Sequence, residues 1–585
     1  MWILRLNMTD RSYKIEEVPE RYKQLGGRAM TSTLIHDEVD PQAHPLGPNN
    51  KLVFAPGLLA GTSAPSSGRM SVGGKSPLTG GIKESNVGSE WSAAMARMGL
   101  KAVVVEGQPA DESFWTVHIA YKEGKPVVEF QQADEYVGQD LYDVYPMLYE
   151  KLSNKVQVAA IGTSGELKYA NSGIAFNDMH KGPTRYAGRG GLGAVMGSKG
   201  LKFLILDAAD TPRVEMANPE LFREGQKKMR EALMEHAITK PQGGLNTYGT
   251  AILINILNEA GGLPTRNFRS GRFEGAADIA GEAIFESNKE RMGKEIYNHG
   301  CSPGCTIQCS NTLYDENCEE IVSCVEYESD WALGANCGIA NLDAIGRMIK
   351  LCNGYGLDTI ETGVTIGVVM DSGMIEFGDE QGTLDLIEQM GKGTPVGRLL
   401  GMGAADVAKA FGNPRSPTVK GQAMPAYEPR AVKGIGVTYA TTTMGADHTA
   451  GYTIAPEILS VGGESDPLQA DKAKADLSRG FQSTTALIDS SGHCLFIAFA
   501  ILDIPSGFEG LIDEINGMLG TNMTQEEAVE TGAEVLRLER AFNEKAGFTN
   551  ADDRLPEFMK YEKLPPHNVV ADLSDEVMDS VYGEL

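Results

Sequence analysis

Three closely spaced cysteines and one remote cysteine constrain this chain most, because a shared metal centre would force distant segments together. Cys301, Cys305 and Cys309 stand in the segment HGCSPGCTIQCSN, and Cys494 follows much later in DSSGHCLF. Clustered thiols plus one remote thiol form the ligand set of a 4Fe-4S cluster. A structural zinc site is the alternative, although zinc more often takes its thiolates as two CxxC-type pairs. The pattern favours the cluster and therefore predicts a chain that carries electrons.

Composition and charge limit the cellular compartments and the binding partners that can be expected for this chain. The formal net charge of -27 argues against binding to nucleic acid or to anionic membranes. No export signal is recognised at the amino terminus, and the longest apolar stretch, residues 494–502, is too short to span a bilayer. We therefore expect a cytoplasmic protein with reduced thiols. The remaining cysteines are predicted to be buried small side chains, namely Cys318, Cys324, Cys337 and Cys352.

The chain length and the change in residue pattern predict an α+β protein of several domains. A chain of 585 residues is too long for one core. Short apolar runs punctuated by Gly, Pro and Ser predict strands at residues 52–54, 102–105, 115–120, 156–161 and 201–206. Glycine-rich stretches at 66–88 and 185–200 interrupt this block. We predict a β-rich domain at 1–210 and two mainly helical domains at 211–425 and 426–585.

Helix signals support the two later domains. Asn218 followed by Pro219 and Glu220 predicts the start of a helix that runs to about residue 238. Thr524 and Glu527 form a capping-box sequence ahead of a second helix. Apolar residues also recur at helical spacing in 342–352 and 384–390.

A short internal repeat of the form N/D-x-x-G-x-D/C follows two apolar helical stretches. The first copy contains Asn353, Gly356, Leu357 and Asp358, and the second contains Asp489, Gly492, His493 and Cys494. A glycine that ends a helix can turn backbone amides and a carboxylate toward a ligand. Two such loops predict one ligand held from two sides. The alternative is two helix ends that merely look alike.

Two further patterns bear on chemistry. The segment RYAGRGGLG (185–193) offers backbone amides and guanidinium groups to a polyanion such as phosphate, although a tight turn between strands is the alternative. No Walker-type GKS/T follows it. Glu326 and Glu328 in CVEYESDW, together with His448 in MGADHTAG, could activate water and polarise a carbonyl. Spacing alone does not bring these three residues together.

Taken together, these segments resemble the aldehyde:ferredoxin oxidoreductase family, the tungsten enzymes with a bis-pterin cofactor. The resemblance covers nearly the whole chain. Its motifs occur in the family's order, namely SSGR-x6-SPLTG with SN-x-G after it, GRGGLGAVMGSKG, the cysteine trio, EYES, the two repeat loops and DHTAG.

The resemblance implies a β-sheet base that carries two pterins, with two helical domains closed over them. Arg69 would lie between the cluster and one pterin. The pterin phosphates and a bridging Mg²⁺ would be held by Asn86, Gly88, Arg189, Gly190, Gly191 and Gly193. The repeat loops would grip the pterins, so that Cys494 joins a cofactor loop to the cluster. The metal would be tungsten or molybdenum, and the sequence does not choose between them because pterin sulfurs rather than protein residues would hold it.

Three departures from the family pattern are visible. The trio is spaced C-x3-C-x3-C rather than the usual C-x2-C-x3-C, and a Gly/Pro loop can absorb one extra residue. Asn353 replaces the usual acid at the start of the first loop. No E-x-x-H stands near residues 340–350, so we expect the interface iron of one relative to be absent.

The activity implied by the resemblance is the oxidation of an aldehyde with water to a carboxylic acid. His448 would polarise the carbonyl, and Glu328, or else Glu326, would act as the base on water. Electrons would pass through the cluster to a ferredoxin or a ferredoxin-like subunit, and we expect an oligomer or a hetero-complex. One alternative is the tungsten subunit of an aromatic acyl-CoA reductase. Another is a metal-stapled structural or electron-transfer subunit without an active site of its own.

Overall fold

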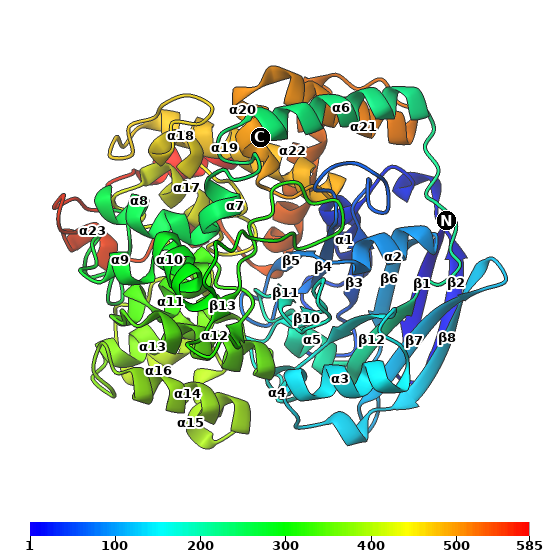
Figure 1. The fold of residues 1–585 in the computed structure, drawn as a ribbon, viewed down its shortest axis with the longest axis horizontal. Helices are drawn as coiled ribbons and strands as arrows, with labels where there is room; N and C mark the ends of the chain where they lie inside the picture. The colour runs from blue at the N-terminus through cyan, green and yellow to red at the C-terminus, as the bar shows by residue number, and fades with distance from the viewer. Residues whose placement is uncertain (584–585) are drawn as a thin grey trace.

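Two six-stranded sheets form the amino-terminal part of the molecule, and helices make up most of the rest (Figure 1). The computed structural model describes residues 1–583. Two short two-stranded ribbons, β13 (Leu313–Tyr314) with β14 (Glu320–Val322) and β15 (Thr418–Val419) with β16 (Gln422–Ala423), lie within the helical part. The predicted α+β class is therefore confirmed.

The two sheets repeat one topology. The first sheet has the order β2-β1-β6-β3-β4-β5, and the second has the order β11-β10-β9-β12-β7-β8, which is the same pattern read from the other edge. In each sheet the first and last strands along the chain pair in parallel, β1 with β6 and β7 with β12, and all other pairs are antiparallel. The sheet region is thus built from two equivalent halves.

The strand bounds confirm every strand predicted from the apolar runs. The first half contains β1 (Trp2–Asn7), β2 (Ser12–Glu17), β3 (Leu52–Pro56), β4 (Arg69–Lys75), β5 (Ile82–Gly88) and β6 (Leu100–Glu106). The second half contains β7 (Trp115–Lys122), β8 (Lys125–Gln132), β9 (Gln157–Ala160), β10 (Ile174–Phe176), β11 (Arg185–Ala187) and β12 (Leu201–Asp207).

Alternation along the strands places the sheets face to face. Val103 and Val105 of β6 enter the core between the sheets, whereas Val104 enters the core under helix α1 (Gly27–Glu38). On the second sheet Leu204 faces the shared core, and Phe203 packs under α3 (Leu141–Lys151). Because successive side chains of a strand point to opposite faces, each sheet packs on the other sheet with one face and on a helix with the other. The result is four layers in the order helix, sheet, sheet, helix.

The glycine-rich stretch at 66–88 does not interrupt the sheet, which corrects one expectation. It forms the β4–β5 hairpin. A Cβ added at Gly73 would lie 2.7 Å from the Cβ of Thr31, so glycine lets α1 pack closely against this strand. The second stretch forms β11 and the short helix α5 (Leu192–Ser198).

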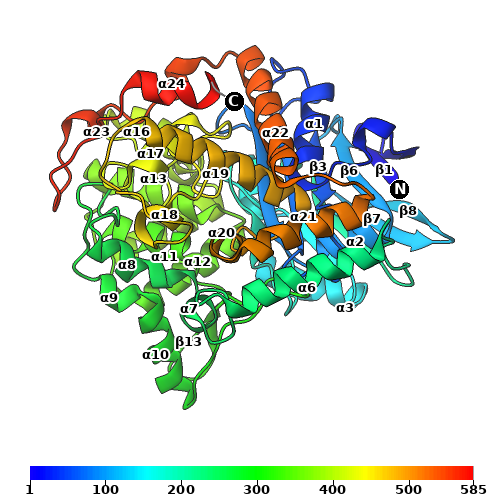
Figure 2. The same cartoon turned by 90° about the horizontal axis from the view of Figure 1, so that it is seen from above.

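The helical part begins with α6 (Pro219–Glu235), whose N-cap is Asn218 as predicted. Figure 2 shows α6 lying along α21 (Pro505–Leu519). The two backbones approach closely, because Cβ atoms added at Gly225 or Gly517 would meet the other helix's backbone at 2.6 and 2.5 Å. The first helix after the sheets therefore packs with a late one, and the domain boundaries at 210 and 425 stay predictions.

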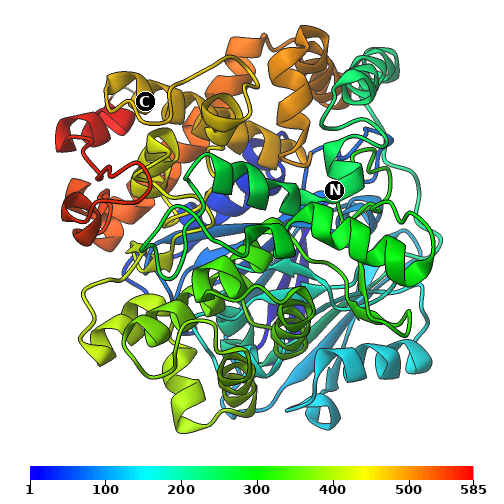
Figure 3. The ribbon, with the colours of Figure 1, turned by 60° about the vertical axis from the view of Figure 1, so that its left-hand side comes forward.

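Helices from the last region cover the outer face of the first sheet. Both α19 (Lys472–Ser491) and α22 (Gln525–Ala546), the latter with its predicted capping box, pack against α1. Helices α12 (Leu342–Tyr355) and α14 (Glu380–Lys392) contain the apolar repeats predicted in the middle region. Figure 3 shows the middle helices in front of the strands. Among residues 1–583, no helix combines the length and apolar character needed to cross a bilayer.

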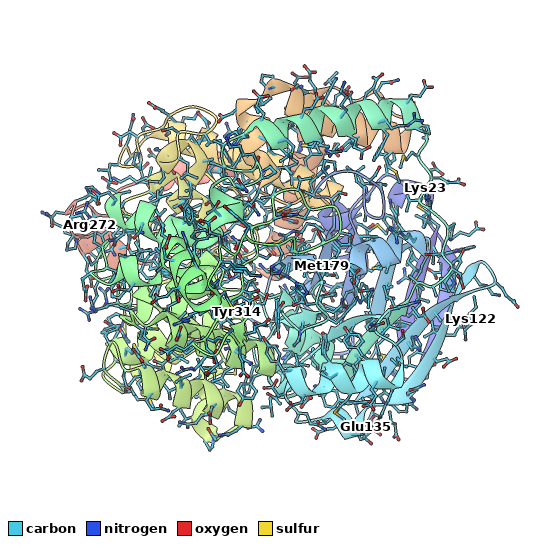
Figure 4. All side chains as sticks on the ribbon, in the orientation of Figure 1. Lys23, Lys122, Glu135, Met179, Arg272 and Tyr314 are labelled. Atoms are coloured by element: carbon cyan, nitrogen blue, oxygen red, sulfur yellow. The ribbon has the colours of Figure 1, made fainter. Side chains whose placement is uncertain are left out.

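The seam between the sheets and the middle helices is visible in Figure 4, where Met179 of the β10–β11 connection and Tyr314 of β13 are labelled.

Candidate active site

A cavity of about 360 Å³ lies where the sheets meet the helical regions. Residues from all three predicted domains line it. Those proposed from sequence and found there are Arg69, Asn86, Gly88, Arg189, Cys301, Cys309, Glu326, Glu328, Asn353, Leu357, Asp358, His448, Asp489 and Cys494. Folding therefore brings together side chains that lie far apart along the chain.

The repeat loops are two helix C-termini that dock on equivalent places of the two sheets. Gly356 ends α12 with φ +77°, and Gly492 ends α19 with φ +91°, a region that favours glycine. The carbonyl of Gly356 accepts from the amide of Gly173, just before β10, at 2.9 Å. The carbonyl of Gly492 accepts from the amide of Arg69, at the start of β4, also at 2.9 Å. The sequence repeat thus reflects the duplication of the sheets.

The remote cysteine is held beside the trio by main-chain bonds. The amide of Cys494 donates to the carbonyl of Ser66 at 2.9 Å, and the amide of Ser66 donates to the carbonyl of Gly304 at 3.0 Å. Gly304 has φ +78° and open space around it, so the loop carrying the extra residue of the trio turns at the surface. A Cβ at Gly88 would lie 2.8 Å from the Sγ atom of Cys301, so only glycine lets that thiol approach β5.

These four thiols provide the type of ligand that a 4Fe-4S cluster takes, one thiolate for each iron. Cys301 and Cys494 are each 8% exposed. Among residues 1–583, no group of three His, Cys, Asp or Glu side chains that could hold a metal ion is found.

Arg69 faces these thiols. Its Nη2 atom donates to the Sγ atom of Cys494 at 3.5 Å, and its Nε atom has no hydrogen-bond partner. Burial lowers the pKa of Arg69, but the charges of Cys494, Cys301 and Cys309 outweigh burial and hold this pKa above its ordinary value. A guanidinium with a free N–H beside thiolates suits a cluster and a neighbouring polar cofactor.

Buried polar atoms without hydrogen-bond partners gather around the cavity. They include Arg69 Nε, Asn86 Nδ2, Arg189 Nε, Asp358 Oδ2 and Glu84 Oε1. Burial raises the pKa of Glu84 to about 8 and that of Asp489 to about 6. Such unsatisfied groups are costly unless a polar ligand pairs with them. The donor and acceptor set therefore fits a pterin cofactor with phosphate groups.

Arg189 joins the cavity to a buried charge network. It donates through Nη1 to the carbonyl of Ala446 at 2.7 Å, and its Nε atom lies 3.6 Å from Oδ2 of Asp358. Asp447 belongs to the same network, and its Oδ2 atom lies 3.5 Å from Nζ of Lys83. Burial raises the pKa of Asp447, but Lys83 and Arg189 outweigh it and keep that carboxyl ionised.

Glu328 and His448 meet in the cavity. The Nε2 atom of His448 lies 3.3 Å from Oε1 of Glu328, although the two are not aligned as a hydrogen bond. The other oxygen, Oε2, accepts from the amide of Ala426 at 2.9 Å. Burial raises the pKa of Glu328 to about 8 and lowers that of His448 to about 4. A neutral imidazole beside a carboxyl poised near neutral pH is suited to acid–base chemistry.

Glu326 lies in the same cavity but has other partners. Its Oε2 atom accepts from the hydroxyl of Thr250 at 2.8 Å, and Oε1 accepts from the thiol of Cys324 at 2.9 Å. Arg185 Nη1 lies 3.6 Å from Oε1. The partners of Glu326 are thus Thr250, Cys324 and Arg185, whereas Glu328 lies next to His448.

Several residues proposed from sequence support the cavity without lining it. Gly191 has φ +74° at the start of α5, and a Cβ at Gly193 would lie 2.3 Å from the carbonyl oxygen of Gly173. The carbonyl of Gly190 accepts from the hydroxyl of Ser76 at 2.7 Å. The imidazole of His493 lies against α21, with Nε2 at 3.1 Å from Oε2 of Glu514. Outside the cavity lining are Cys305, Gly190, Gly191, Gly193, Gly356, Gly492 and His493.

Sequence reasoning missed some lining residues and misplaced one cysteine. Asp447, Tyr427 and Tyr452 also line the cavity, and the ring of Tyr427 lies 5.7 Å from that of His448. Asp447 stands inside the motif around His448, which was the available signal, and Arg185, offered from sequence with its glycine-rich segment, lines the cavity as well. Cys318 was expected to be buried but is exposed, because it occupies the turn of the β13–β14 hairpin with φ +63°.

Comparison with known proteins agrees with this geometry. The family model for the N-terminal domain of aldehyde ferredoxin oxidoreductase matches residues 3–208, and the model for its domains 2 and 3 matches residues 224–584. These matches identify the chain as an oxidoreductase. This chain belongs to the aldehyde ferredoxin oxidoreductase family.

Individual relatives cover nearly the whole chain. It is 36% identical over 584 residues to the tungsten-containing aldehyde ferredoxin oxidoreductase of Pyrococcus abyssi, covering 96% of this chain and 92% of that one. The enzyme of the same name from Pyrococcus furiosus is also 36% identical, over 587 residues, with 96% and 91% covered. A solved structure of the active-site complex BamBC of benzoyl coenzyme A reductase shares the fold, with a TM-score of 0.81 and 19% identity, covering 100% of this chain and 93% of that one.

Proposed function

We propose that this protein oxidises aldehydes with water to carboxylic acids at a tungsten or molybdenum bis-pterin centre. Electrons leave through a 4Fe-4S cluster to a ferredoxin or a ferredoxin-like subunit. The observation that carries this proposal is the Glu328–His448 pair, 3.3 Å apart, in the cavity that also contains the Arg69–Cys494 contact. The names of the relatives that are 36% identical support the aldehyde substrate and the tungsten centre.

The chain's own residues provide places for each group. Asn86, Arg189, Asp358 and Asp489 line the cavity and would offer donors and acceptors to two pterins, and Asn86 with the Arg189 segment would hold the phosphates and Mg²⁺. The cluster would be held by Cys301, Cys305, Cys309 and Cys494. When bound, the metal–pterin centre accepts the two electrons released as the carbonyl carbon is oxidised.

His448 is the residue that orients and polarises the aldehyde. Because its pKa is lowered to about 4 by burial, the imidazole is neutral at ordinary pH and carries one N–H donor. This N–H group can donate a hydrogen bond to the carbonyl oxygen of the aldehyde and so polarise the carbonyl. Its Nδ1 atom has no hydrogen-bond partner within the protein.

Glu328 is the residue that takes a proton from the attacking water. Aldehyde and water together yield the carboxylic acid, two electrons and two protons, so a base must accept a proton as the new C–O bond forms. Only the ionised carboxylate can do this, and its pKa of about 8 makes that form more abundant as pH rises. We prefer Glu328 to Glu326 because Glu328 contacts His448, whereas Glu326 faces Cys324 and Arg185.

Anaerobic purification followed by metal analysis and dye-linked assays tests this function. We expect tungsten or molybdenum near one per chain, about four irons, and turnover of aldehydes. Zinc without these metals would contradict the proposal and favour the metal-stapled subunit. A second function, reduction of an aromatic acyl-CoA, is favoured by the fold shared with benzoyl coenzyme A reductase. Activity with acyl-CoA esters and none with aldehydes would establish it instead.

A further inference from the structure

One edge of helix α6 carries exposed cations. Arg223, Lys227 and Arg230 are exposed and lie four and three residues apart, the spacing that places side chains on one side of a helix. Met234 extends this row and is 44% exposed. Lys227 lies 3.8 Å from Glu231, whereas among residues 1–583 Arg223 and Arg230 have no ion pair or hydrogen bond through their guanidinium groups. The four residues 223, 227, 230 and 234 form the cationic edge of α6.

The acids of α6 lie on its other edge, which faces α21. Lys228 marks that edge, because its Nζ atom lies 2.8 Å from Oδ2 of Asp513 and 3.4 Å from Oε2 of Glu509, both in α21. Glu224 and Glu231 are exposed and lie four residues before and three residues after Lys228. The positive charge of α6 is therefore collected on the edge away from α21.

The cationic edge is turned toward the loop at residues 62–67. Gln226 lies three residues after Arg223 and four before Arg230, so its side chain leaves the helix on the same side as theirs. The Nε2 atom of Gln226 donates to the carbonyl of Ser63. This contact places the loop next to the cationic edge.

The same loop holds the cysteine trio at the surface. The amide of Ser66 donates to the carbonyl of Gly304 at 3.0 Å, and its hydroxyl accepts from the amide of Thr306 at 3.3 Å. Ser66 therefore binds the chain on both sides of Cys305, which is partly exposed and, unlike the other three proposed cluster ligands, does not line the cavity. Ser63 and Ser66 are three residues apart, a separation that spans at most about 10 Å. The cationic edge thus lies close to this thiol.

The surface over the trio is uncharged. Its exposed residues are Pro303, Gly304 and Gln308, and Ser63 is exposed beside them. A protein can contact this surface without stripping water from a charge, and the cations of α6 then form part of a charged rim. Because the whole chain has a formal net charge of -27, the cationic edge has the sign opposite to that of the molecule around it.

We propose that the cationic edge of α6 and the loop around Cys305 form the docking surface for an acidic iron–sulfur protein that accepts the electrons. This inference rests on the proposed function, which supplies the cluster and two electrons for each aldehyde oxidised. Two one-electron reductions of the acceptor balance that oxidation. Arg223 and Arg230 have no partner within the protein, so carboxylates of the acceptor can pair with both. Between two proteins of negative net charge, such a local positive surface orients the encounter and raises the association rate.

Reduction of a purified 4Fe-4S ferredoxin of negative net charge, with an aldehyde in excess, tests the docking surface on the holoenzyme. We expect the double variant Arg223→Gln, Arg230→Gln to raise KM for this ferredoxin about tenfold, at the lower end of electrostatic effects on association. This KM should also depend less on salt than that of the unmodified protein. Reduction of benzyl viologen, a small cation that needs no docking surface, should be unchanged.

The double variant Lys125→Gln, Lys155→Gln is the matched control, because it removes the same charge from two exposed side chains in the second half of the sheet region. Lys125 lies opposite Lys122 in the β7–β8 hairpin, and Figure 4 labels Lys122 at the edge of the molecule. We expect this control to keep the KM of the unmodified protein for the ferredoxin.

The inference is overturned if the double arginine variant keeps the KM of the unmodified protein. It is also overturned if the lysine control raises KM by the same factor, which would assign the effect to net charge. An unmodified protein that reduces benzyl viologen with aldehyde, but not the ferredoxin, would exclude the proposed partner. An unmodified protein that reduces neither acceptor would instead refute the proposed function itself.

Discussion

Glu328 at the start of α11 (Tyr327–Leu333) and His448 in the loop after α17 (Lys433–Thr441) approach to 3.3 Å between Oε1 and Nε2. The two residues come from different predicted domains, and both line the cavity where those domains meet. Burial then moves their pKa values in opposite directions, to about 8 for the acid and about 4 for the imidazole. The pair is therefore a product of the tertiary fold.

Removing either member of this pair should lower turnover without emptying the site. We expect His448→Ala and Glu328→Gln each to reduce kcat by about 10²–10⁴-fold, the usual contribution of a positioned acid or base. Tungsten and iron contents, measured on the same samples, should stay near those of the unmodified protein. Full activity in either variant would exclude that residue from the reaction.

The rate should rise with pH as Glu328 ionises. Because burial raises the pKa of this carboxyl to about 8, the basic form is scarce in mildly acidic solution and grows until pH exceeds that value. His448, with a pKa of about 4, stays neutral over this range. We expect kcat/KM to increase with an inflection near 8. If residual activity in Glu328→Gln keeps the same inflection, another group is responsible.

The buried pair of Arg28 and Glu539 should stabilise the contact between α1 and α22. Arg28 donates from Nε and Nη2 to the two carboxylate oxygens at 2.9 and 2.8 Å, and Thr443 also donates to Glu539. Glu539→Gln should cost about 3–5 kcal/mol, because it removes the bidentate carboxylate partner of a buried cation, which then keeps only the longer contact with Asp489 at 3.3 Å. A lower apparent Tm in calorimetry checks this. Glu388→Gln, at an exposed pair on α14, is the control and should leave Tm unchanged.

The same pair gives a pH dependence with a defined sign. Burial raises the pKa of Glu539, but Arg28, Thr443 and Ser32 outweigh burial, and the folded pKa lies below its ordinary value. A depressed pKa contributes stability above the unfolded pKa, and this contribution is lost as pH falls through the folded value. The difference in Tm between the unmodified protein and Glu539→Gln should therefore shrink in acid. A constant difference would contradict this explanation.

The strands were predictable because their apolar runs are local signals. Residues 102–105 and 201–206 are strands for the reason given from sequence, and the Asn218 cap starts its helix. The β4–β5 hairpin was missed because Gly73 weakens the strand pattern, and its glycine is explained only by the approach of α1. A contact between segments that are distant along the chain cannot be inferred from the local sequence pattern of either segment.

The site was predictable only in part, for a similar reason. The family was identified from motifs, and the comparisons confirm it. The individual roles of the site residues stay predictions. Arg185 was proposed only as one of the guanidinium groups of the glycine-rich segment, because its contact with Cys324 and its buried N–H groups without acceptors appear only after folding. Cys318 was placed wrongly because composition favours buried cysteines, whereas a hairpin turn exposes this one.

The loop that joins the cofactor site to the cluster should depend on close backbone contact at Gly57. A Cβ there would lie 2.1 Å from the Cα atom of Gly492 and 2.5 Å from its nitrogen, so no flexible side chain can move aside. Gly57→Ala should therefore push the Gly492 turn, and Cys494 after it, away from Arg69. We expect the purified protein to contain less iron and less tungsten or molybdenum, as measured by elemental analysis.

Gly480 provides a matched control within α19, the helix that carries the Gly492 turn. A Cβ at Gly480 meets nothing within 4 Å, and its φ is ordinary for a helix. Gly480→Ala should therefore keep its metals and gain up to about 1 kcal/mol from the better helix propensity of alanine. If Gly57→Ala contained as much iron as Gly480→Ala, the close contact of the two glycines would not be what holds Cys494 in place. Both variants add the same methyl group, so a difference in their metal contents reports the effect of where that group is placed.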